Sequence, residues 1–229
     1  MSRIDDALDA IAQIGESSER TLATCGLIST LLRIKNVQSV VVGPFAYACY
    51  AQMQDARPSV LLQTKTPHLP VRIIYEVMAE MLPAHGHQAE WNLLGTQITF
   101  GGQFVSEHTE LCRDLQTDFG IVSLMPPEQL IADYIVAANQ PYQDAVSVHR
   151  AKRLMALAME NAFDLDWNQL REIADGENYR VGELAAQLRQ QTKAELDAAQ
   201  ASETPAPAAE PAPEPETEPP TEATLSPQD

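Results

Sequence analysis

The residues best suited to chemistry lie in one stretch, from Val37 to Tyr50. Its β-branched residues, Val40 to Val42, run into Gly43, and this pattern predicts a short buried strand that ends at a sharp turn. The residues after the turn predict the start of a helix. A strand, a turn and a helix in this order direct backbone N–H groups at a point just past the strand, where a phosphate can bind. Gly43 is therefore the first candidate ligand-binding residue.

Three other short motifs have the spacing of known sites, and a structural role is favoured for each. Asp118-Phe-Gly120 copies the magnesium motif of kinases, but the glycine-rich loop, strand lysine and catalytic aspartate that must precede it are absent. His85-Gly-His87 lies in a loop expected to end a helix, and it needs a third ligand to hold a metal. Asp164 and Asp166 have metal-ligand spacing, but they precede a predicted helix, where aspartates cap the N-terminus.

The only dense basic segment runs from His149 to Arg153, within a helix predicted over residues 146–162. Arg150, Lys152 and Arg153 are the strongest polar candidates for a ligand site, because they are expected to pack near the glycine turn. The alternative is a solvated helix face that offsets an acidic protein.

Charge and composition exclude several classes of function. The 229 residues carry a net charge of −17, and the last thirty contain seven acidic groups and no basic one. Such a chain repels nucleic-acid phosphates and anionic membranes, so neither is an expected partner. Three widely spaced cysteines without a CxxC pair favour a reducing compartment over a disulfide framework or a structural zinc. Without a secretory signal or an apolar run long enough to span a membrane, the expected location is cytoplasmic.

The elements predicted around Gly43 give an α/β (α+β) fold, with a small mixed sheet, surrounding helices and a helical C-terminal subdomain. Two amphipathic helices are expected before residue 38, and strands at Ser59–Gln63, Trp91–Leu94, Gln97–Phe100 and Ile121–Leu124. The segment from Glu107 to Asp118 is ambiguous and polar, and a helix is one interpretation of it. The predicted organisation is N-terminal helices (1–37), an α/β core (38–125), a helical subdomain (126–199) and a disordered acidic tail rich in Pro, Glu and Ala (200–229).

Three segments resemble the minimal nucleotidyltransferase superfamily, in particular bacterial proteins found as toxin or antitoxin partners. Val41-Val-Gly43-Pro44 followed by Phe45-Ala-Tyr-Ala is similar to the family's strand, glycine turn and small-residue helix. Ile121-Val-Ser-Leu-Met-Pro-Pro-Glu-Gln-Leu-Ile131 is similar to a strand followed by the family's "proline, acid, polar, Leu-Ile" helix start. The segment from His149 to Ala174 is similar to the helix pair that closes such domains. The resemblance covers about residues 20 to 190 and implies the fold described above.

The resemblance also implies where catalytic groups belong, and this chain departs from the family there. Family enzymes hold Mg²⁺ with an Asp-x-Asp pair on the strand after the glycine turn. Ser59 and Leu61 stand in those places, and leucine cannot ligate a metal. Pro44 lacks the backbone N–H that a phosphate would accept from. Tyr134 stands where a lysine is often found.

Three hypotheses follow for the function. The first is a non-catalytic nucleotidyltransferase-fold protein with a binding or regulatory role. It has no catalytic residue and no cofactor. Its partner is another protein, and a nucleotide is a further ligand. Its candidate ligand-binding residues are Gly43, Ser59, Arg150, Lys152 and Arg153. The second is an active transferase that acts on protein or RNA, binds Mg²⁺ with an NTP, and uses relocated acids: Asp55, Glu107 or Glu110 with Lys152. The third is a plain scaffold.

Overall fold

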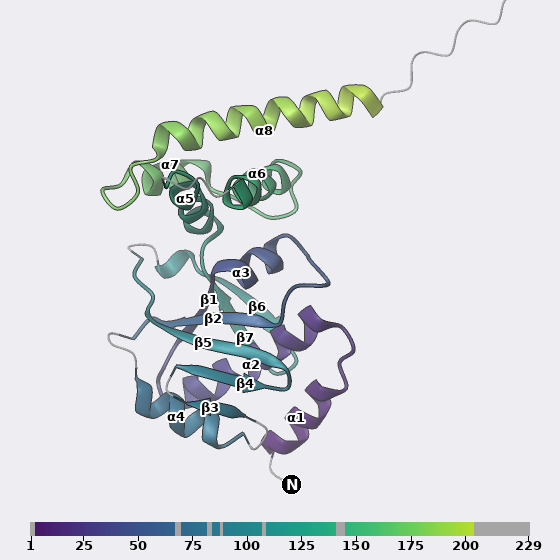
Figure 1. The fold of residues 1–229 in the computed structure, drawn as a ribbon, viewed down its shortest axis with the longest axis vertical. Helices are drawn as coiled ribbons and strands as arrows, with labels where there is room; N and C mark the ends of the chain where they lie inside the picture. Colours follow the sequence, from purple (N-terminus) through teal and green to yellow (C-terminus); the bar gives the residue numbers. More distant parts are fainter. Residues whose placement is uncertain are drawn as a thin grey trace, which may run out of the picture.

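The computed structural model describes residues 3–66, 70–81, 84–87, 89–106, 109–140 and 145–203. A mixed sheet forms the centre of the first part of the chain, and the helices that follow it form a separate layer at one end (Figure 1). This arrangement confirms the predicted α/β class with a helical C-terminal part.

The sheet contains seven strands within the described residues, in the order β3-β4-β5-β2-β1-β7-β6. Strand β1 lies in the interior of the sheet, antiparallel to β2 and parallel to β7, while β2 is parallel to β5. The strands are β1 (Ser39–Val42), β2 (Ser59–Thr64), β3 (His85–His87), β4 (Glu90–Leu93), β5 (Thr96–Gln103), β6 (Arg113–Thr117) and β7 (Gly120–Leu124).

The two faces of the sheet differ in what covers them. Helix α2 (Ser17–Ile34) lies against one face, where the hydroxyl groups of Ser29 and Ser39 form a hydrogen bond of 2.9 Å. On β2 the residues of this face are buried and those of the opposite face are more exposed, as period-2 alternation requires. In Figure 1, α2 lies behind the sheet and no helix crosses in front of β2 and β5. We call this second side the open face.

The remaining helices of the first part pack around the same core. Helix α2 is buried over most of its length, and Gly26 permits its close approach to the β6–β7 hairpin, because a Cβ there would collide with the Thr117 side chain. Besides α2, the helices of the first part are α1 (Arg3–Ala12), α3 (Gly43–Tyr50) and α4 (Val71–Ala79). A 3-10 turn, η1, spans Thr109–Leu111.

The C-terminal part consists of four helices in the described residues. They are α5 (Pro127–Ala138), α6 (Ala145–Met159), α7 (Trp167–Asp175) and α8 (Gly182–Glu203). Helix α5 enters the layer directly after β7, and α8 crosses over the other three (Figure 1). Residues 200–203 of the predicted disordered tail belong to α8 instead, and the rest of that tail lies outside the described residues. Among the described helices, none combines the length and apolar character that a membrane span requires.

Two elements differ from the sequence-based expectation. The segment for which a helix was one interpretation holds η1 and strand β6 instead, and His85–His87 forms edge strand β3 rather than a loop. Both strands lie at the ends of the sheet, where only one neighbour supplies hydrogen bonds. An edge strand needs little apolar alternation, and therefore its sequence resembles that of a loop.

Candidate functional site

The Gly43 turn lies between the end of β1 and the start of α3. Gly43 has a φ of +67°, a left-handed conformation that glycine adopts without strain. Its N–H donates to the Met125 sulfur at 3.4 Å, and Pro44 occupies the first turn of α3 without an N–H to offer. Phe45 and Ala46 supply the remaining donors of this helix N-terminus. The turn thus has fewer donors for an anion than the sequence pattern suggests.

Ser59 and Leu61 lie on the open face of β2, close to the Gly43 turn. Leu61 pairs directly with Val42, the last residue of β1, in the antiparallel register. On the other side of β2, Ser59 pairs with Gln97 and Leu61 with Thr99. Side chains directly opposite one another in a sheet share a face, so hydroxyl, amide and alkyl groups surround this point. The strand positions nearest the turn hold no carboxylate.

Arg150 extends from α6 into the junction with α3 and α5. Its guanidinium carbon lies 5.4 Å from the ring centroid of Tyr47 and 5.5 Å from that of Tyr134. The two rings meet edge to face, with centroids 5.9 Å apart. Burial raises the pKa of Tyr134, and the adjacent Arg150 charge partly opposes this increase. Tyr47 is one helical turn from Gly43, so Arg150 is the basic candidate that the fold brings nearest to the turn.

The other two basic candidates point elsewhere. Lys152 forms an ion pair with Glu195 of α8 at 2.6 Å, on the side of α6 that packs against that helix. Arg153 is exposed. Residues 150, 152 and 153 therefore do not form one positive cluster at the Gly43 turn, because a helix distributes adjacent residues around its axis.

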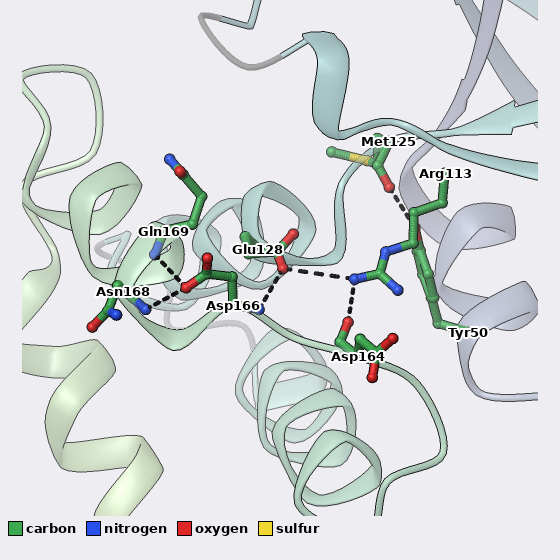
Figure 2. Close-up of polar contacts among 8 residues, drawn as sticks. All are labelled: Tyr50, Arg113, Met125, Glu128, Asp164, Asp166, Asn168 and Gln169. Carbon is green, nitrogen blue, oxygen red and sulfur yellow. Dashed lines mark hydrogen bonds and ion pairs between the residues drawn. The ribbon is translucent and has the colours of Figure 1, made fainter.

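A polar junction that the sequence did not reveal connects the sheet to the C-terminal helices (Figure 2). Glu128, in the first turn of α5, is buried, with a side chain only 4% exposed. Its Oε1 accepts a hydrogen bond from the backbone N–H of Asp166 at 2.9 Å. The Arg113 guanidinium of β6 lies 3.9 Å from the same oxygen and donates to the Asp164 carbonyl. A buried carboxylate is stabilised only by such partners, so this junction fixes how the two parts meet.

Met125 completes the connection on the α3 side of the junction. Its carbonyl accepts from the Tyr50 hydroxyl at 2.8 Å, while its sulfur accepts from Gly43. Its own N–H donates to the Val41 carbonyl at 3.0 Å. Both ends of α3 are thus held by the residue that connects β7 to α5. The only signal in the sequence was the Pro-Pro-Glu helix start at Pro126, which does not show that Glu128 is buried.

Of the other motifs, the Asp164–Asp166 segment provides the helix cap that the sequence predicted. The Asp166 carboxylate caps α7, since its Oδ1 accepts from the N–H groups of Asn168 at 2.9 Å and Gln169 at 3.1 Å. Across the described residues, no three His, Cys, Asp or Glu side chains gather as a metal site would need. The side chain of His87 and all of Glu107 lie outside those residues.

The cysteines are unsuited to nucleophilic chemistry. Burial raises the pKa of the Cys49 thiol to about 12, and raises that of Cys25 further still. Burial also raises the pKa of Cys112, although the neighbouring Lys65 partly offsets it. A thiol must ionise to act as a nucleophile, so none of the three is activated.

Comparisons with known proteins give a distant similarity in fold. No protein-family profile matches the chain, and no curated protein matches it significantly. Among solved structures, it is similar to the solution structure of the antibiotic-resistance factor ANT(2'')-Ia, an aminoglycoside nucleotidyltransferase. The match covers 76% of this chain and 92% of that one, with 12% sequence identity and a TM-score of 0.38. So distant a likeness carries no information on activity.

Proposed function

We propose that this chain is a non-catalytic protein of nucleotidyltransferase type, with a binding or regulatory role toward another protein. Three placements support the family assignment. The glycine turn joins a central strand to a helix, the next strand returns beside it, and a Pro-Pro-Glu segment starts the first helix of the C-terminal layer. These are the segments whose sequences resemble the family.

The observation that carries the proposal is the pairing of Leu61 with Val42 beside Gly43. The resemblance implies a pair of carboxylates on this strand, at Ser59 and Leu61. Two carboxylates on one face of a strand hold a divalent cation that neutralises the triphosphate and orients its attack. An alkyl group and a single hydroxyl cannot replace them. Arg150, the basic candidate nearest the turn, lies over the rings of Tyr47 and Tyr134.

Relocated acids receive less support. That alternative needs Lys152 beside the Gly43 turn together with Asp55, Glu107 or Glu110. Lys152 instead pairs with Glu195 on α8.

The test uses the full chain with each of the four ribonucleoside triphosphates. Calorimetry with Mg²⁺ and with EDTA measures binding, and α-³²P-labelled nucleotides added to a cell extract measure transfer to protein or RNA. We expect no Mg²⁺-dependent transfer. Mg²⁺-dependent NTP binding together with label transfer would overturn the proposal. In that case Asp55→Asn and Glu110→Gln, compared with the exposed control Asp197→Asn, would identify the relocated acids.

A further inference from the structure

Strand β6 leaves one edge of the sheet open to a further strand. Among the described strands it is the last in the order and pairs only with β7. Asp114 and Gln116 are exposed, while the residues between and beside them are half-buried. Every second residue of an edge strand directs its N–H and C=O away from its neighbour. The edge thus has the donors and acceptors that an added strand requires.

A pocket of about 310 Å³ lies beside this edge, between the start of α2, helix α3 and β6. Leu115 is the β6 residue that contributes to its wall. Ser18 stabilises another wall, because its hydroxyl bonds to the carbonyls of Met53 and Gln54 and accepts from the Ala56 N–H. The apolar lining comprises Leu22, Phe45, Ala48, Cys49, Met53 and Leu115.

The size and position of the pocket suit one large apolar side chain of an added strand. Ligand pockets generally begin at roughly 300 Å³, so this one has the volume for an aliphatic or aromatic group. In an extended segment alternate side chains point to the same face. A segment paired with β6 would direct one such side chain toward the pocket and its neighbours away from it.

The rim of the pocket determines the charge of its occupant. Glu16 and Glu19 are its only charged lining residues, and both are exposed. A basic segment is attracted to them, whereas the chain's own acidic tail is repelled. A second copy of this chain is disfavoured in the same way, since each carries a net charge of −17.

We propose that the β6 edge and its pocket bind an extended, basic peptide segment of a partner protein, with one apolar side chain in the pocket and Lys or Arg facing Glu16 and Glu19. This inference rests on the proposed binding role and names its surface and partner class. Strand addition provides affinity through main-chain hydrogen bonds and specificity through the pocket. Transfer assays test the absence of catalysis, and peptide binding tests this surface, so either can fail alone.

The binding experiment uses fluorescein-labelled octapeptides and the full chain. One peptide alternates Lys with Val and Leu, and its matched control has Glu in place of every Lys. Fluorescence anisotropy should show saturable binding of the basic peptide and none of the acidic one. Absence of binding up to about 1 mM protein, the concentration at which even weak affinities are detected, would overturn the proposal.

Charge reversal at the rim identifies the site. We expect the double variant Glu16→Lys, Glu19→Lys to bind the basic peptide about fivefold or more weakly and to bind the acidic peptide more tightly. Glu172→Lys with Glu177→Lys makes the same change in net charge at exposed positions of the C-terminal layer and should have little effect. Equal losses in the two double variants would mean that only overall charge attracts the peptide, which would contradict the proposal.

Filling the pocket and mapping the edge test the geometry. Ala48→Met places a larger side chain in the pocket and should weaken binding of the basic peptide that contains Val and Leu. Binding of a basic peptide with Ala in place of Val and Leu should be affected less. Hydrogen exchange should show new protection, when the basic peptide binds, of the β6 amides that point away from β7. Peptide binding without new protection of these outward-pointing amides would overturn the assignment. Their protection in the absence of peptide would also overturn it, and the dependence of that protection on protein concentration would separate a second copy from the chain's own tail.

Discussion

The Glu128 carboxylate and the backbone N–H of Asp166 form a hydrogen bond of 2.9 Å that joins the first turn of α5 to the residue that caps α7. The same oxygen lies 3.9 Å from the Arg113 guanidinium of β6. One buried acid therefore connects the sheet with two helices of the C-terminal layer (Figure 2). The contact belongs to the Pro-Pro-Glu segment, so it gives that segment a structural role in this chain.

Removal of this acid should destabilise the protein. Glu128→Ala leaves the Asp166 N–H and the Arg113 charge without their partner, which costs about 2–3 kcal/mol of the free energy of unfolding. Glu128→Gln keeps an acceptor oxygen and should cost roughly half as much. Urea unfolding followed by circular dichroism measures both. Glu76→Ala, which breaks an exposed ion pair with Arg72, is the matched control, with an expected loss of at most about 0.5 kcal/mol. A loss at Glu128 no larger than the control would refute the junction's role.

The sequence predicted the centre of the fold because the information there is local. The valines that lead into Gly43 and the Pro-Pro pair before α5 determine the backbone by sterics and by the lack of an N–H. The capping role of Asp166 was predictable for the same reason and is confirmed. Each of these signals depends on residues within a few positions of one another.

Features that depend on distant residues were not predictable. Strand β6 has a single apolar residue of its own and is a strand because β7 pairs with it. The burial of Glu128 depends on packing against segments far along the chain. Arg150 and Lys152 looked like one basic cluster, but they contact tyrosines on one side and α8 on the other. Helical rotation separates them, and only the packing of α6 shows which side each faces.

The three basic residues of α6 should differ in their effects on stability. Arg150→Met removes a cation from above two tyrosine rings and should cost about 1–2 kcal/mol. Lys152→Met breaks the ion pair with Glu195, whose side chain is 64% exposed, so the loss of stability should be about 0–1 kcal/mol. Arg153→Met, at an exposed position, should change stability by less than about 0.5 kcal/mol. Thermal unfolding of the three variants measures this order, and equal losses would contradict the placement of Arg150.

Restoring carboxylates beside the glycine turn should create a cation site. In the Ser59→Asp, Leu61→Asp double variant, two acids share the open face of β2, and we expect weak divalent binding with a Kd of roughly 0.1–1 mM. The wild type and a variant with the same two changes at Gln97 and Thr99 are the comparisons, with Mn²⁺ electron paramagnetic resonance as the measurement. Leu61 is half-buried, so its replacement also costs stability, and circular dichroism must confirm folding. A folded double variant that binds no more Mn²⁺ than the wild type would show that these positions are not those of the metal pair.

Asp133 should make stability depend on pH between about 4 and 6. Desolvation raises the pKa of its carboxyl to about 6, and a 2.9 Å hydrogen bond from the Tyr179 hydroxyl partly opposes this shift. The folded state thus holds this proton more tightly than the unfolded state, so the stability from this group is present below pH 4 and is lost as the pH rises through 6. More than a third of the residue is exposed, and solvent screening reduces the effect. Asp133→Asn should flatten the pH dependence of the melting temperature in this window and raise stability above pH 6, whereas Tyr179→Phe should move the transition to higher pH. Asp197→Asn on the exposed end of α8 is the control, and an Asp133→Asn profile parallel to it would sink the assignment.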